Sequence, residues 1–335
     1  MVIPQKYLVF LGDVAAPLDA KTGFGLVDWR PEACVGQLRL PACKVDLGVP
    51  DMTPAQAIDA GAQTLVIGVA PFGGRIAPSW IAPIVQAIDA GLNVASGMHM
   101  RLGTVPEIAA AAQRSGRKLF DVRHADRAFP VGSGRKRTGK RLLAVGTDCA
   151  VGKKYTALSI ARGMQQAGFK ATFRATGQTG ILIAGGGVAI DAVIVDFIAG
   201  AAEWLSPDND ADHWDVIEGQ GSLFHPAYAG VSTGLLHGSQ PDAIVLCHDA
   251  GRESIDGYPD FPLPTLERCI DLNLQVGRIT NPAIRCVGVA VNTSRLGEAK
   301  RGEYLGEIGK RLGIPAFDPV ATGPGKLVEA LKSFK

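Results

Sequence analysis

The sequence is poor in aromatic side chains and has almost no net charge. Only 6% of its 335 residues are Phe, Trp or Tyr, whereas 47% are hydrophobic, so its cores must be mainly aliphatic. The formal net charge is +2. Such a chain has no overall basic field to attract nucleic acid or an anionic membrane, and we expect neither as a partner. The apolar content is typical of a folded α/β protein and excludes a disordered chain.

Targeting, membrane and disulfide signals are also lacking. The N-terminal segment has no basic stretch followed by a long apolar one, as a secretory signal has. The longest apolar stretch, 181–205, contains Asp191, Asp196 and Glu203 and is too charged to span a bilayer. None of the six cysteines forms a Cys-x-x-Cys pair, so we expect free thiols in the cytoplasm. The scattered His, Asp and Glu residues predict no metal site.

Two α/β domains are predicted, at 1–135 and 136–335. Between them, 129–140 is rich in Gly, Pro and basic residues, which indicates an exposed linker. Before it, a strand at 63–69, a helix at 78–90 and a strand at 92–96 predict a Rossmann-like unit. After it, strands are expected at 141–145, 170–174, 216–217, 243–247 and 285–291. Helices are expected at 153–167, within 188–202, and at 265–273, 299–312 and 325–334. This alternation is typical of a doubly wound parallel sheet with helices on both faces.

A phosphate-binding loop is predicted between the strand at 141–145 and the helix that follows. Glycines allow the backbone N–H groups to turn toward phosphate oxygens, and the helix N-terminus adds its positive dipole end. Lys153 supplies a mobile charge. The expected binding residues are Gly146, Thr147, Asp148, Cys149, Ala150, Val151, Gly152, Lys153 and Lys154.

The loop departs from the usual P-loop in two ways. It has five residues between its glycines instead of four, and Lys154 stands where a Ser or Thr normally binds magnesium. The next hydroxyl is that of Thr156. These departures favour a ligand that carries phosphates without losing them, such as coenzyme A, over ATP hydrolysis.

Candidate catalytic groups follow the strand at 216–217, in EGQGSLFH. Glu218 and His225 could act as a general base, although a buried hydrogen-bond network would also explain Glu218. Ser222 is predicted to contact substrate. A nucleophilic role for it lacks the G-x-S-x-G spacing, and helix capping is the structural alternative.

Further polar side chains follow other predicted strands. Gln178 and Thr179 lie in ATGQTG and offer amide and hydroxyl groups to a substrate, or simply form a polar turn. Arg252 and Arg75 could bind substrate carboxylates, or be ordinary surface arginines. Asn292 could bind the edge of an adenine, or end its strand in a turn.

The C-terminal half resembles dethiobiotin synthetase-like P-loop proteins in GTDCAVGKK, ATGQTG and DVIEGQGS. Nearly the whole chain is similar to a bacterial family long known as a domain of unknown function. VIEGQGSLFHPAYAGVSTGLLHG and PDAIVLCHDAGR carry this closer match. Members that share YLVFLGDVAAPLDAKTGFGLVDW resemble D-glutamate N-acetyltransferases.

This resemblance implies acetyl transfer from acetyl-CoA, as cosubstrate, to the α-amine of D-glutamate. A partner dehydrogenase would then take up the N-acetylated product in D-amino-acid catabolism, and we expect a homo-oligomer. Two alternatives remain. One is an ATP- and magnesium-dependent ligase or carboxylase like dethiobiotin synthetase. The other is a nucleotide-binding protein without turnover.

Overall fold

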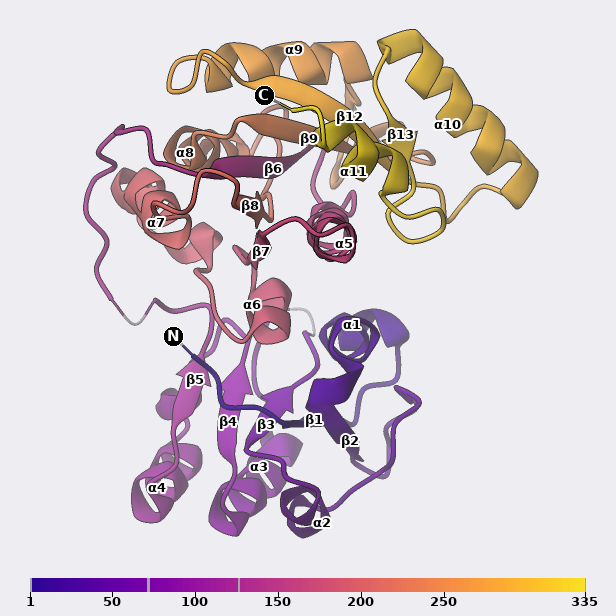
Figure 1. The fold of residues 1–335 in the computed structure, drawn as a ribbon. Helices are drawn as coiled ribbons and strands as arrows, with labels where there is room; N and C mark the ends of the chain where they lie inside the picture. Colours follow the sequence, from indigo (N-terminus) through magenta and orange to yellow (C-terminus); the bar gives the residue numbers. More distant parts are fainter. Residues whose placement is uncertain (1, 71–72, 126, 335) are drawn as a thin grey trace. The chain divides into compact units, whose positions relative to one another are not determined.

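The computed structural model describes residues 2–70, 73–125 and 127–334, which form two compact units (Figure 1). The first unit contains Met1–Asp126 and Gln178–Ala192, and the second contains Arg127–Gly177 and Val193–Lys335. The chain therefore passes between the units three times. A single division at residue 135 does not anticipate the return of 178–192 to the first unit.

The first unit is built on a five-stranded parallel sheet in the order β2-β1-β3-β4-β5. This arrangement confirms the Rossmann-like prediction. Strand β1, between β2 and β3, is buried along its whole length. The strands are β1 (Tyr7–Gly12), β2 (Cys34–Arg39), β3 (Thr64–Ile67), β4 (Asn93–Ser96) and β5 (Leu119–Asp121). The helices are α1 (Lys21–Trp29), α2 (Pro54–Asp59), α3 (Pro78–Ala90), α4 (Pro106–Ser115) and α6 (Gln178–Ala184).

Proline and glycine set the ends of two of these helices. Helices α3 and α4 begin at Pro78 and Pro106, where a missing N–H costs nothing. Gly91 and Gly116 cap their C-terminal ends, with left-handed φ angles of 116° and 62°. The predicted helix at 78–90 is confirmed with these bounds.

The second unit is built on a six-stranded parallel sheet in the order β13-β12-β9-β6-β8-β7. The strands are β6 (Lys140–Gly146), β7 (Ala171–Arg174), β8 (Trp214–Ile217), β9 (Ala243–Asp249), β12 (Arg285–Asn292) and β13 (Ala316–Phe317). A separate antiparallel hairpin joins β10 (Ser254–Ile255) to β11 (Tyr258–Pro262). The helices are α5 (Lys153–Gln166), α7 (Ile198–Leu205), α8 (Ala229–Ser239), α9 (Leu266–Gly277), α10 (Glu298–Leu312) and α11 (Gly325–Leu331).

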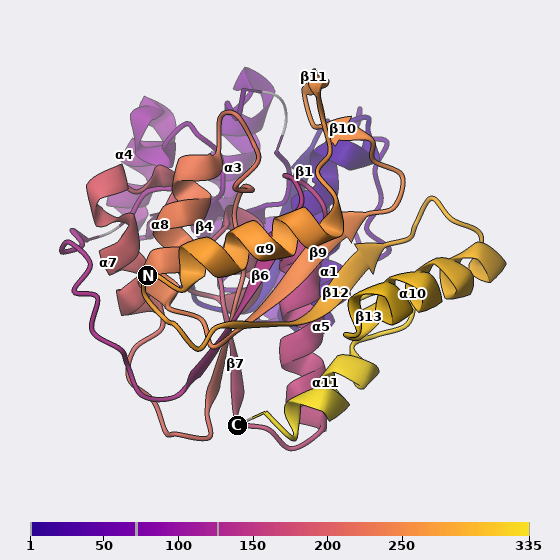
Figure 2. The ribbon, with the colours of Figure 1, turned by 90° about the horizontal axis from the view of Figure 1, so that it is seen from above.

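Helices cover both faces of this sheet, as predicted. Alternate residues of β6 point to opposite faces of the sheet. On one face, Leu142 and Ala144 pack in a core with α5 and α11. Leu143 and Val145 face a pocket that α8 and α9 also line. Figure 2 shows α9 lying across the strands on this second side. The carboxyl ends of β6, β7, β8, β9 and β12 meet at one edge, where ligands bind in such sheets.

Two sequence predictions are wrong in part. The helix expected within 188–202 begins only at Ile198, and two short 3-10 turns precede it. The predicted linker is exposed over much of its length, but Arg137 is only 6% exposed. Its guanidinium donates to the backbone carbonyls of Ser206, Gly238 and Ser239, which follow or end α7 and α8. A basic residue can thus be internal when it neutralises helix C-termini.

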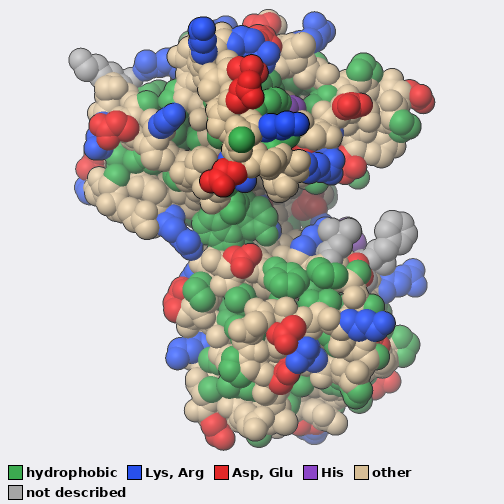
Figure 3. Space-filling model, turned by 90° about the vertical axis from the view of Figure 1, so that its right-hand side faces the viewer, with side chains coloured by type: hydrophobic (Ala, Val, Ile, Leu, Met, Phe, Trp, Pro, Cys, Tyr) green, Lys and Arg blue, Asp and Glu red, His purple; other side chains and the backbone are tan. Residues whose placement is uncertain are grey.

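Surface charges of both signs are mixed on the face shown in Figure 3, consistent with the small net charge. Among the residues that the structure describes, no helix is long and apolar enough to cross a membrane.

Candidate active site

The predicted phosphate loop connects β6 directly to α5 in the second unit. Ala150 and Gly152 have positive φ angles of 53° and 96°, so the loop turns sharply before the helix begins at Lys153. Gly152, the N-cap residue of α5, offers no side-chain cap. The N–H groups of a first helical turn have no partner within the helix, and anionic ligands commonly bind at such a helix N-terminus.

Lys153 lies inside the loop. It is 7% exposed, and its Nζ donates a hydrogen bond to the carbonyl oxygen of Asp148 at 2.7 Å. Burial lowers the pKa of Lys153. A bound phosphate would bring negative charge to this buried ammonium and thereby favour its charged form.

Asp148 fixes the loop to the segment that follows β9. Its carboxylate is fully buried and accepts hydrogen bonds from the backbone N–H groups of Cys149, at 2.6 Å, and Asp256, at 2.8 Å. Arg252 Nη1 completes the set: it lies 2.7 Å from Asp148 Oδ2 and 2.7 Å from the Cys149 carbonyl oxygen. Arg252 thus holds the phosphate loop, and its predicted contact with a substrate carboxylate stays a prediction.

The residues after Lys153 do not offer a hydroxyl to the loop. Thr156 is buried beside Cys247 on β9. Burial raises the pKa of Cys247 to about 11, so the thiol keeps its proton. The Lys154 ammonium lies 4.4 Å from the ring centroid of Tyr155. This part of the loop therefore lacks the magnesium-binding hydroxyl of an ordinary P-loop.

Glu218 follows β8 and is only 4% exposed. Its Oε2 accepts hydrogen bonds from the backbone N–H groups of Thr176 and Gly177, both at 3.0 Å. The Thr176 hydroxyl donates to the Glu218 carbonyl at 2.7 Å. The carboxylate is therefore held firmly at the sheet edge, in the buried network that the sequence left open as an alternative. The role of general base stays a prediction.

His225 is 2% exposed, and its Nδ1 accepts a hydrogen bond from the backbone N–H of Ala227 at 3.1 Å. A neutral imidazole whose Nδ1 is an acceptor carries its proton on Nε2. His225 can consequently donate a hydrogen bond from Nε2. It cannot act as a base there, because a base needs a free lone pair and Nε2 carries the proton. This geometry leaves Glu218 as the better of the two predicted bases.

Ser222 links two loops of the site. Its hydroxyl donates to the Thr147 carbonyl at 3.0 Å and accepts from the N–H of Phe224 at 3.2 Å. Both hydrogen-bonding directions are thus used within the protein, which supports a structural role. The local turn, rather than a helix cap, is what the hydroxyl stabilises.

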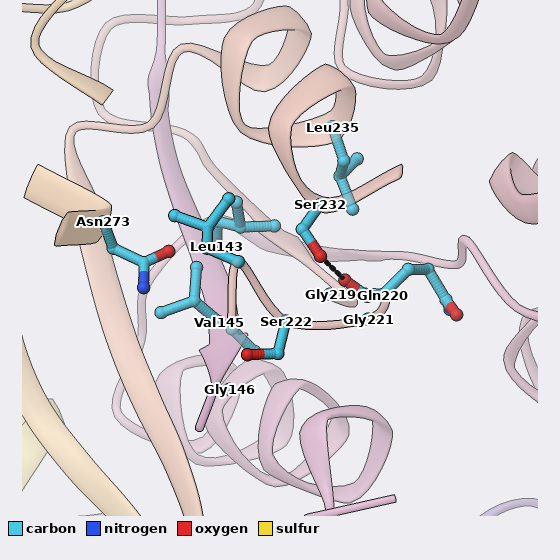
Figure 4. Close-up of a pocket in the computed structure, with 12 residues that line it drawn as sticks. Leu143, Val145, Gly146, Gly219, Gln220, Gly221, Ser222, Ser232, Leu235 and Asn273 are labelled. Atoms are coloured by element: carbon cyan, nitrogen blue, oxygen red, sulfur yellow. Dashed lines mark hydrogen bonds between the residues drawn. The ribbon is translucent and has the colours of Figure 1, made fainter. Parts of the chain in front are cut away.

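A small pocket lies behind this loop, between β6 and the helices α8 and α9 (Figure 4). Its walls are apolar at Leu143, Val145 and Leu235, and polar at Asn273 and Ser232. The Ser232 hydroxyl donates to the Gln220 carbonyl at 2.8 Å. The pocket thus lies next to the glycine-rich loop at 219–222, and Ser232 on its wall holds that loop by a hydrogen bond.

One group of three potential metal ligands occurs in the described part of the chain, at Asp148, Cys149 and His225. Their ligand atoms lie within 4.8 Å of one another. The sequence pattern gave no sign of it, because the group forms only when the phosphate loop meets the segment after β8. However, Arg252 already neutralises the Asp148 carboxylate, and burial raises the pKa of the Cys149 thiol. Both features disfavour a cation here.

Three predicted substrate residues belong to the first unit. Arg75 is exposed after β3. Gln178 Oε1 accepts a hydrogen bond from Arg123 Nε at 2.8 Å, and the Thr179 hydroxyl lies 3.1 Å from that of Thr22. Arg123 was not predicted; its position directly after β5 is the signal that could have indicated it.

Asn292, in the second unit, is the predicted adenine contact. Its amide donates to Asp249 Oδ2 at 3.2 Å and its oxygen accepts from Ser294 N–H at 3.1 Å. Within the protein it forms the strand-ending turn that was the structural alternative. The prediction of an adenine contact remains untested.

Comparison with known proteins places this architecture in a family. A model described as a domain of unknown function, the DUF1611_C P-loop domain, matches residues 130–328. The chain belongs to the DUF1611 family. The companion DUF1611_N Rossmann-like domain matches residues 38–125. A crystal structure of a DUF1611 family protein from Anabaena variabilis is 33% identical, with a TM-score of 0.86 over 98% of this chain and 99% of that one.

Two DUF1611 relatives have a named activity. A D-glutamate N-acetyltransferase from Tritonibacter scottomollicae is 52% identical over 330 residues, which cover 98% of this chain and 99% of the relative. A protein of the same name from Pseudoalteromonas sp. is 46% identical over 331 residues, covering 99% of this chain and 100% of the relative.

Proposed function

We propose that this DUF1611 protein is a D-glutamate N-acetyltransferase that takes its acetyl group from acetyl-CoA in the cytoplasm. The observation that carries the proposal is the identity of 52% and 46% to two proteins of that name over nearly complete chains. The phosphate loop supports coenzyme A as the donor, because it combines the buried Lys153 with an uncapped helix N-terminus. The N-acetylated product would pass to a dehydrogenase.

The proposed reaction needs a base, a positioned thioester and a donor for the developing oxyanion. The α-ammonium of D-glutamate must lose a proton before its nitrogen can attack, and Glu218 is the proposed acceptor. The free amine then attacks the thioester carbonyl carbon. The amide forms, coenzyme A leaves as the thiol, and one proton is released overall. A hydrogen bond from His225 Nε2 would stabilise the oxyanion of the tetrahedral intermediate.

The decisive experiment measures thiol release from acetyl-CoA with D-glutamate, in parallel with phosphate release from ATP and magnesium. We expect thiol release without ATP, undiminished by EDTA, because no transferred phosphate requires a metal. L-glutamate should react far more slowly, since it cannot place two carboxylates and the amine in the same three positions. Phosphate release that depends on D-glutamate would instead support a ligase, and no turnover in either assay would overturn the proposal.

A further inference from the structure

Three aromatic side chains gather around His225 in the second unit. The ring of Tyr228 lies 4.5 Å from that of His225, centroid to centroid, at an angle of 35°. The Tyr258 ring meets His225 edge-on at 5.2 Å, and Phe261 meets Tyr258 edge-on at 5.9 Å. We call Tyr228, Tyr258 and Phe261 the aromatic face. Tyr228 immediately precedes α8, whereas the other two lie on β11.

Much of the aromatic face is open to solvent. Tyr228 is 53% exposed and Phe261 is 48% exposed. Exposed apolar side chains that occur singly need no explanation, but these two exposed rings are connected by ring contacts through His225 and Tyr258, and a surface of linked rings is typical of a binding site. The protein has few aromatic residues altogether, which makes their grouping here more informative.

The aromatic face borders the phosphate loop. A ring nitrogen of His225 lies within 4.8 Å of a carboxylate oxygen of Asp148 and of the Cys149 sulfur. From the other side, Asp256, in the turn between β10 and β11, donates its N–H to Asp148 at 2.8 Å. The segments that carry the rings are thus both fastened to the loop that binds phosphate.

We propose that the aromatic face stacks the adenine base of the coenzyme whose phosphates bind the loop at 146–154; this rests on the proposed function. A purine has a flat π surface, and aromatic rings bind such surfaces without needing specific hydrogen bonds. The competing position at Asn292 has its amide engaged by Asp249 and its oxygen by Ser294. Coenzyme A carries an adenine and phosphates in one molecule. It could therefore bind the phosphate loop and the neighbouring aromatic face at the same time.

The test compares two acetyl donors in calorimetric titrations and in the transfer assay. Acetyl-CoA contains adenine, whereas S-acetyl-4′-phosphopantetheine keeps a phosphate and the thioester but lacks it. We expect Tyr228→Ala and Phe261→Ala to weaken acetyl-CoA binding by about 5- to 150-fold, the usual worth of one stacked base. Binding of the shorter donor should change less than about twofold, and Tyr228→Phe should restore acetyl-CoA binding.

Ile279→Ala is the matched control, because Ile279 is 72% exposed and lies between α9 and β12, at the opposite edge of the sheet. It should leave both affinities unchanged. Equal losses for the two donors, or no loss for either, would overturn the stacking proposal while acetyl transfer itself persists. Failure of the wild-type protein to bind acetyl-CoA would overturn the proposed function instead. A change in oligomeric state on Tyr228→Ala, with unchanged binding, would assign the aromatic face to a second copy of the chain.

Discussion

At the scale of single residues, Lys153 should matter most for coenzyme binding. Its ammonium is held inside the loop by the Asp148 carbonyl, ready to meet a phosphate. Lys153→Ala removes a charge-assisted hydrogen bond of roughly 1.5–3 kcal/mol, so the Kd for acetyl-CoA should rise by about 10- to 150-fold. Calorimetric titration measures this directly. An unchanged affinity would show that the loop does not bind this donor.

Glu218→Gln separates catalysis from structure. Gln keeps the size of the side chain and an oxygen that can accept from Thr176 and Gly177 N–H. If Glu218 is the base, turnover should fall by roughly 10²–10⁴-fold while acetyl-CoA affinity stays constant. The lost rate should partly return at high pH, where free amine becomes abundant. A lower melting temperature without rescue at high pH would mean that Glu218 is structural.

His248 should make stability depend on pH. It is 8% exposed, and burial lowers its pKa from the usual 6.5. Between the lowered folded-state value and 6.5, the unfolded chain binds more protons, so the free energy of unfolding rises with pH across this window and then levels. Denaturation at a series of pH values measures this dependence. Below pH 6.5, the free energy of unfolding of His248→Gln should rise less steeply with pH than that of the wild type.

At the scale of elements, the glycine-rich loop after β8 passes very close to β6. A Cβ at Gly219 would lie 1.7 Å from the Ala144 carbonyl oxygen, and this backbone atom cannot move aside. Gly219→Ala should therefore cost about 1–3 kcal/mol or more of unfolding free energy, and displace Glu218 as well. Thermal denaturation and the transfer assay would both show the loss.

The matched control for this loop is Gly230→Ala, early in α8. A Cβ there has nothing within 4 Å, so the melting temperature should hold or rise slightly, because Ala favours the helix. If both glycine variants behaved alike, close approach of the two backbones would not be the reason for Gly219.

The sequence predicted these elements unevenly, for physical reasons. Strands with continuous apolar residues and helices with regular spacing, such as β9 and α5, lie within two residues of their predicted bounds. Helix α8 was missed because its sequence, AGVSTGLLHGS, is rich in glycine and small polar residues. Tertiary packing against α7 and α9 overrides that weak propensity.

The sequence predicted the position of the phosphate loop in the candidate site, but not the hydrogen bonds and ion pairs that hold the site together. Spacing correctly placed the loop at 146–154 and Glu218 at the ends of buried strands, while their roles stay predictions. It could not show that Arg252 neutralises Asp148, or that Nδ1 of His225 faces a backbone N–H. Arg252 and Asp148 are distant in sequence and only the fold brings them together, whereas the His225 contact is a local turn whose hydrogen bond the spacing does not reveal.

At the scale of the whole molecule, the first unit depends on residues encoded after the phosphate loop. Helix α6 buries Ile181, Leu182 and Ile183, which are at most 2% exposed. Each buried side chain of this size contributes roughly 1.5–3 kcal/mol, a large share of the roughly 5–15 kcal/mol that stabilises a domain.

A fragment of residues 1–126 should therefore unfold at a lower temperature than the same fragment joined through a flexible linker to 178–192. Circular dichroism melts of the two proteins measure the difference. Equal melting temperatures would mean that α6 adds nothing to the stability of the first unit.

The return of the chain to its first unit also has a consequence for synthesis. A ribosome releases β1 to β5 early, yet α6, which packs on α1 of the same unit, emerges only after β6, the phosphate loop, α5 and β7 have been made. The usual order, in which an N-terminal domain is complete before the next one begins, does not hold for the first unit. Residues 1–126 are thus made well before the last segment of their own unit, so a translation pause before residue 192 would prolong the time without α6 and the exposure to chaperones and proteases.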